Sequence, residues 1–161
     1  LDAAIAMNVP HGGWCPKGRK AEDGPIPERY PLTETRSETY PERTWRNMAE
    51  ASATLVLHQG RISGGTRLTL NNCRKLDHKR SLLGGYPYLS MHMGQDGVVE
   101  AILAWLQKHK VTVLNVAGPR ESKEPGVYGR ARAILGQVLG KCCSKGRQGE
   151  ADGTGVFDPP F

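Results

Sequence analysis

The short segment ISGGT, residues 62–66, has the residue types of an anion-binding turn. It follows the apolar run ATLVLH and precedes a segment with a helical pattern. Free amides at a helix N-terminus attract anions, glycines let a ligand approach the backbone, and the hydroxyl of Thr66 adds a donor. A plain tight turn is the alternative. The position after a buried strand favours a phosphate-type site at Gly64, Gly65 and Thr66.

A second glycine loop, AGPRES, follows another apolar run, VTVLNV. Gly118 allows close approach of backbone, Arg120 can bind an oxyanion through two N–H groups, and Ser122 adds a donor. The same loop also fits a surface pair of Arg120 with Glu121 and a helix cap from Ser122 or Glu124. The local sequence does not decide between these two interpretations.

No arrangement of side chains predicts catalysis. Glu22 and Asp23 are adjacent carboxylates in a loop, and such neighbours rarely share a proton. The four cysteines form no CxxC pair and the histidines show no ligand spacing, so we expect no metal site and a reducing, cytoplasmic compartment.

Predicted strands and helices alternate along the chain. Continuous apolar runs at 53–58 and 111–117 predict buried strands, and 9–15 and 31–35 predict short ones. Helical spacing predicts helices over 39–52, 65–76, 95–110 and 126–141. Thr39 and Glu42 fit a capping box, and Trp45 takes a core position. Between Leu76 and Gln95, either RSLLG or PYLSMHM can supply the next strand.

This alternation predicts an α/β fold with a mostly parallel sheet and helices on both faces. Residues 1–143 form the predicted domain, and the polar, glycine-rich residues 144–161 are predicted to be a disordered tail. In such sheets ligands bind beyond the carboxyl ends of the strands, and both glycine loops occupy that position.

The chain of 161 residues carries a net charge of +6, with a pI of about 9.3. Its basic residues are scattered and only 6% of residues are aromatic, which favours local anion sites over a nucleic-acid partner. No apolar run has the length of a bilayer span, and we expect no membrane partner.

Four ordered segments resemble the molybdenum cofactor carrier family. They are PHGGWCPKGRKAEDGPIPERYPL, YPERTWRN, ATLVLHQGRISGGTRLTL and LNVAGPRESKEPGVYGRAR, within residues 1–140. The resemblance implies a Rossmann-like three-layer sandwich, related to the Lonely Guy phosphoribohydrolases. It also implies a dimer or tetramer, and a phosphorylated pterin, molybdopterin, as the bound cofactor.

Carried over by position, the resemblance places the phosphate-binding turn on Gly64, Gly65 and Thr66. It implies that further residues line or support the same pocket: Gly118, Pro119, Arg120, Glu121, Ser122, Lys17, Arg43 and Asn47.

Two features depart from the family pattern. Family members begin with a strand and a glycine loop of the type GGQTGVD just before the equivalent of Leu1. The resemblance therefore predicts that a first central strand is missing here, between the strand near His11–Cys15 and the strand Ala53–His58. The stretch HKRSLLGGYPYLSMHM replaces a shorter turn.

Three functions fit this pattern: a non-catalytic carrier of the cofactor, a nucleotide phosphoribohydrolase, and a nucleotide sensor. The distant enzymes carry a glutamate three residues after the threonine of their glycine motif. Thr69 occupies that position, so we expect no catalysis. The sequence does not separate the carrier from the sensor, because both need the same phosphate cradle.

Overall fold

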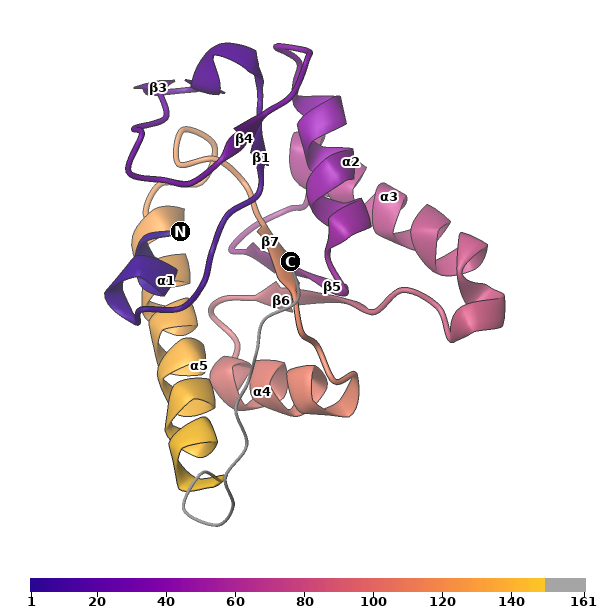
Figure 1. Ribbon diagram of the computed structural model, residues 1–161, viewed down its shortest axis with the longest axis vertical. Helices are drawn as coiled ribbons and strands as arrows, with labels where there is room; N and C mark the ends of the chain where they lie inside the picture. Colours follow the sequence, from indigo (N-terminus) through magenta and orange to yellow (C-terminus); the bar gives the residue numbers. More distant parts are fainter. Residues whose placement is uncertain (150–161) are drawn as a thin grey trace.

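The computed structural model describes residues 1–149, with side chains described through residue 144 (Figure 1). Along the chain the elements are α1 (Asp2–Ala6), β1 (Trp14–Cys15), the 3-10 turn η1 (Lys17–Arg19), β2 (Lys20–Ala21), β3 (Gly24–Pro25), β4 (Thr33–Glu34), α2 (Tyr40–Glu50), β5 (Ala53–His58), α3 (Gly64–Lys79), the 3-10 turn η2 (Ser81–Leu83), β6 (Tyr88–His92), α4 (Val98–Lys108), β7 (Leu114–Ala117) and α5 (Val127–Gly149).

The main sheet has the strand order β6-β5-β7, and both pairings are parallel. Leu55 at its centre lies opposite Leu89 of β6 and Val116 of β7. Five of the six residues of β5 are buried, which explains its continuous apolar sequence. The predicted parallel sheet is confirmed, although it is small.

Helices cover both faces of this sheet (Figure 1). On one face, α4 and α5 pack on the strands through a core that includes Leu57, Ile102 and Val138. On the other face, α2 and α3 enclose a second cluster with Met48 and Cys73 at its centre. The predicted α/β architecture with three layers is therefore confirmed.

Two further pairs of short strands lie outside the main sheet. β1 pairs with β4 in parallel, and β2 pairs with β3 in a tight antiparallel hairpin. The guanidinium of Arg19 organises this part of the chain, because it donates hydrogen bonds to the carbonyl oxygens of Ile26, Pro27, Tyr30 and Leu32. The sequence predicted β1 and β4 as short strands but left the hairpin as loop.

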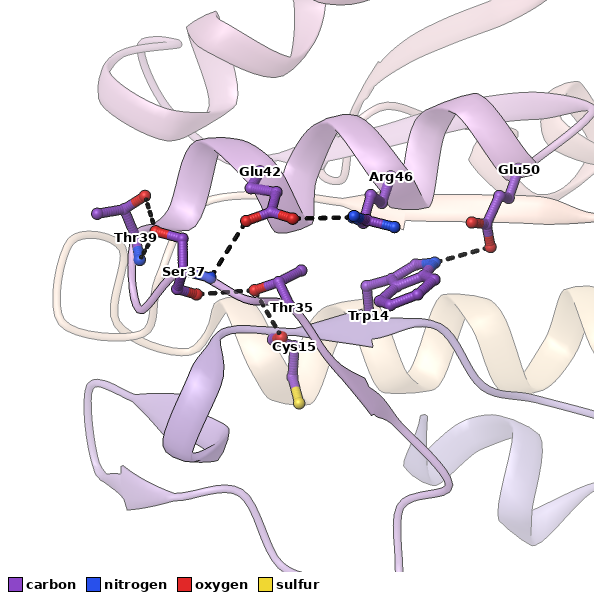
Figure 2. Close-up of polar contacts among 8 residues, drawn as sticks. All are labelled: Trp14, Cys15, Thr35, Ser37, Thr39, Glu42, Arg46 and Glu50. Carbon is purple, nitrogen blue, oxygen red and sulfur yellow. Dashed lines mark hydrogen bonds and ion pairs between the residues drawn. The ribbon is translucent and has the colours of Figure 1, made fainter.

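Polar contacts join α2 to the β1–β4 pair (Figure 2). The Trp14 indole donates to Glu50 and lies under the Arg46 guanidinium, which pairs with Glu42. The predicted capping box is not formed as expected: Thr39 makes no side-chain cap bond, and the Glu42 carboxylate accepts from the Ser37 amide.

Several boundaries differ from the prediction. α3 begins one residue early and continues to Lys79, and PYLSMHM supplies β6 rather than RSLLG. Trp45 is 37% exposed beside Lys79 rather than in the core. α5 continues through residues 144–149, beyond the expected boundary of the tail, and 150–161 lie outside the described residues.

The predicted place of a further strand beside β5 is wrong. β5 has β6 on one side and β7 on the other, so both of its edges are already paired. Among residues 1–149, the unpaired edges of the main sheet belong to β6 and β7. The resemblance placed the missing strand next to β5, but β6 and β7 pair with β5. The order of parallel strands depends on long-range packing that local patterns do not encode.

Candidate functional site

The carboxyl ends of β5 and β7 lead into the two glycine loops predicted to bind a ligand. α3 begins directly after the first loop and α5 after the second. The start of α2 lies at the same edge, since Arg120 from the β7–α5 loop lies over the ring of Tyr40. The structure therefore brings three helix N-termini toward one edge of the sheet.

The ISGGT turn leaves its backbone open. Gly64 has a φ of +49°, a conformation that favours glycine. Within residues 1–149, the amides of Gly64, Gly65 and Thr66 donate no hydrogen bond. A Cβ added at Gly65 would meet no atom within 4 Å. The turn thus has the free donors and the empty space that an anion needs.

Two arginines share one aromatic ring near the β7–α5 loop. The Cζ atom of Arg120 lies 4.5 Å from the Tyr40 ring centroid, and that of Arg43 lies 5.6 Å from it. Neither guanidinium forms a salt bridge with any carboxylate in the described part of the chain. Two like charges with no counter-charge form an electropositive site that an oxyanion would stabilise.

Arg43 is the more buried member of this pair. Its Nε is buried and has no hydrogen-bond partner among the described residues. Burial lowers the pKa of Arg43, and the nearby Arg120 charge lowers it further. A buried N–H donor without an acceptor is destabilising, and an anion accepting from it would remove that penalty. Arg43 was predicted only through resemblance; Tyr40, which positions both arginines, was missed.

The other polar side chains of the AGPRES loop already have hydrogen-bond partners within the protein. The Glu121 carboxylate accepts from the amides of Gly126 and Tyr128 at the start of α5. Ser122 donates to Glu22 on the β2–β3 hairpin. A Cβ at Gly118 would lie 2.6 Å from the carbonyl oxygen of Leu57. Gly118 is therefore needed for packing against β5, and Glu121 caps a helix.

Lys17 and Asn47 differ in their availability. Lys17 is exposed in η1. Both ends of the Asn47 side-chain amide are occupied, because Oδ1 accepts from the Trp14 amide at 2.7 Å and Nδ2 donates to the Trp14 carbonyl at 3.1 Å. Asn47 thus pairs with the backbone of β1 much as a neighbouring strand would, and these two bonds fix the orientation of its amide.

Two histidines hold the backbone that leads into the ISGGT turn. The His58 and His92 rings meet edge to face, with centroids 5.6 Å apart. His58 Nδ1 bonds the carbonyl of Gly60, and His92 Nε2 bonds the carbonyl of Gln59. Both were predicted as surface or loop residues, and the spacing of 34 positions gave no signal of their contact.

A groove of about 670 Å³ runs beside β7 and under the β2–β3 hairpin. Its wall includes Leu57, Val116 and Val127, and its rim includes Glu22 and Asp23. Figure 1 shows the loop after β7 reaching toward the hairpin, in agreement with the Ser122–Glu22 hydrogen bond. The volume is in the range of small-molecule sites.

Metal-binding and membrane-spanning features were sought in the described chain. Residues 1–149 contain no group of three or more His, Cys, Asp or Glu side chains placed to hold a metal ion. None of the described helices combines the length and apolar character needed to cross a membrane.

Comparison with known proteins identifies related chains. Residues 1–139 match the model of the Circularly permutated YpsA SLOG family. The chain is also similar to the crystal structure of "Putative molybdenum carrier protein" from Syntrophus aciditrophicus SB, with 34% identity and a TM-score of 0.75. That similarity covers 86% of this chain and 84% of the other. No curated protein matches the chain.

Proposed function

This chain belongs to the circularly permutated YpsA SLOG family, and on that premise we propose that it binds and carries a phosphate-bearing pterin, the molybdenum cofactor, without catalysis. The observation that carries the proposal is the Tyr40–Arg43–Arg120 cluster. It places two guanidinium groups on one ring, and the described residues supply neither a carboxylate paired with them nor an acceptor for the buried Arg43 Nε.

The geometry suits a phosphate better than a neutral ligand. Guanidinium groups bind phosphate through two parallel hydrogen bonds, and the free amides at the start of α3 supply further donors on the same edge of the sheet. The name of the Syntrophus protein supports molybdenum cofactor as the cargo. A dimer or tetramer in the cytoplasm completes the proposal, and light scattering of the purified protein tests the oligomer.

A first experiment identifies the ligand. Small molecules released from freshly purified protein are analysed by mass spectrometry. A molybdopterin-type pterin supports the carrier function, whereas a nucleotide as the dominant species would replace it with the nucleotide-binding alternative.

A second experiment tests the site by calorimetry with a phosphorylated pterin. Arg120→Ala removes one charge-assisted partner, and we expect affinity to fall about 10- to 100-fold. Arg74→Ala is the matched control, because Arg74 is an exposed arginine near the other end of α3. Equal affinities for the parent and Arg120→Ala would contradict the proposed site.

A further inference from the structure

The groove beside β7 lies next to the arginine cluster along the chain. Its lining includes Gly118 and Pro119, and Arg120 is the next residue. One wall is apolar, with Leu57, Val116 and Val127. Tyr40, Arg43 and Arg120 are not among the described residues that line the groove. A ligand whose ring lies in the groove therefore has to extend past Pro119 to place a phosphate on the arginines.

The hairpin over this groove is fixed by one of its two carboxylates. Glu22 accepts from the Ser122 hydroxyl at 2.6 Å and from the Ser122 amide at 3.4 Å. This contact joins the turn between β2 and β3 to the loop after β7. Glu22 is thus a positioning residue, and Ser122 is its partner rather than a free ligand donor.

The second carboxylate is available. Asp23 is exposed at the groove rim, and it forms no hydrogen bond or ion pair within the described residues. Glu121, the other acid at the rim, is occupied by the amides that begin α5. Asp23 is therefore the carboxylate at this groove that can accept hydrogen bonds from a bound molecule.

We propose that this groove binds the ring of an amino-pyrimidinone, with the Asp23 carboxylate accepting from its adjacent ring N–H and exocyclic NH₂ groups. This inference rests on the proposed function for the phosphate, which lies on Arg43 and Arg120. A carboxylate has two acceptor oxygens and matches two parallel donors. The buried Arg43 Nε, which has no hydrogen-bond partner among the described residues, is a second donor suited to the phosphate.

This chemistry selects among rings. Pterin and guanine both present the required pair of donors. Lumazine and xanthine carry a carbonyl oxygen in place of the amino group, which the carboxylate would repel. Adenine has an exocyclic amino group next to an unprotonated ring nitrogen, so it lacks the adjacent pair of donors. The site should therefore discriminate by a single exocyclic group on otherwise matched molecules.

The test measures affinity by calorimetry for two matched pairs: GMP against XMP, and neopterin phosphate against the corresponding lumazine phosphate. We expect the amino form of each pair to bind about 10- to 100-fold more tightly. Asp23→Asn, which replaces an acceptor oxygen with a donor, should reduce that ratio to within about threefold. The tighter of GMP and neopterin phosphate identifies which ring the groove takes.

Matched controls separate the ring from the rest of the molecule. Glu28→Gln changes another exposed carboxylate, which lies in the next loop, between β3 and β4, and should keep the full ratio. Val116→Trp fills the groove and should weaken both members of each pair. Val113→Trp, at an exposed position outside the groove lining, should weaken neither.

The outcomes distinguish this inference from the proposed function. If phosphate-bearing ligands bind but the amino and oxo forms bind equally, or if Asp23→Asn keeps the ratio, the ring assignment is wrong and the phosphate site stands. If Arg120→Ala leaves affinity unchanged while the ratio still depends on Asp23, the phosphate assignment is wrong and the ring site stands.

Discussion

The two glycine loops of this protein occupy equivalent positions, each between a parallel strand and a helix, but they differ in their hydrogen bonding. In the part of the chain that the structure describes, the ISGGT turn leaves three amides without partners and open space at Gly65. The AGPRES loop has a glycine pressed against a backbone carbonyl and two polar side chains already engaged. A glycine before a helix can thus serve a ligand or the packing of the chain itself, and only the three-dimensional neighbours distinguish the two uses.

The largest effect that separates the loops is on stability. Gly118→Ala places a Cβ 2.6 Å from the Leu57 carbonyl, and backbone cannot move away cheaply. We expect a loss of about 3 kcal/mol in the free energy of unfolding, measured by urea denaturation. Gly65→Ala is the matched control and should stay within about 1 kcal/mol of the parent, because its Cβ meets open space. Equal losses at both positions would remove the contrast.

The next effect is on ligand binding, and we expect it at the ISGGT turn rather than at the AGPRES loop. Gly65→Val keeps the fold but fills the space in front of the free amides. We expect affinity for a phosphate-bearing ligand, measured by calorimetry, to fall about 100-fold or more, or about 2.7 kcal/mol. Parent-like affinity in Gly65→Val would show that the turn is only structural.

A third change, at Thr69, tests the expectation that the protein does not cleave nucleotides. Thr69 is 4% exposed and its hydroxyl donates to the Gly65 carbonyl, so this side chain points into the fold. Thr69→Glu should lower stability by about 2 kcal/mol by burying a carboxylate. Neither the parent nor the variant should release free base from adenosine monophosphate. Turnover of about 1 per second in the parent would overturn the non-catalytic assignment.

A fourth change separates function from stability at Arg43, which shares the Tyr40 ring with Arg120 of the AGPRES loop. The buried Nε of Arg43 has no partner within residues 1–149, and Arg43 lies near the Arg120 charge. Arg43→Met should raise the free energy of unfolding by about 1 kcal/mol in the absence of ligand, while phosphate affinity falls. Thermal unfolding with and without ligand measures both. A destabilised Arg43→Met protein would mean that the arginine stabilises the fold rather than the ligand.

The sequence predicted the elements that local patterns encode. β5 and the apolar faces of α4 and α5 follow from uninterrupted or helically spaced apolar residues. It did not predict the pairing of β5 with β7, because register between strands 61 residues apart depends on tertiary packing. Likewise, the sequence predicted that both glycine loops lie between a strand and a helix. It did not predict the hydrogen bond from Ser122 to Glu22, which joins residues 100 positions apart. Such contacts leave no local signal.

The smallest expected effect concerns the carboxylate that closes the AGPRES loop. The amides of Tyr128 and Gly126 hold the pKa of Glu121 below its ordinary value of about 4.5. The folded state therefore favours the ionised form, so this contribution to stability is present above the ordinary pKa and is lost as pH falls through the lowered one. Glu121→Gln should reduce stability modestly at neutral pH, and the difference from the parent should shrink in acid. Urea midpoints across this range measure it, with Glu28→Gln as the exposed control. A difference that does not change with pH would mean that the Glu121 charge contributes nothing to the start of α5.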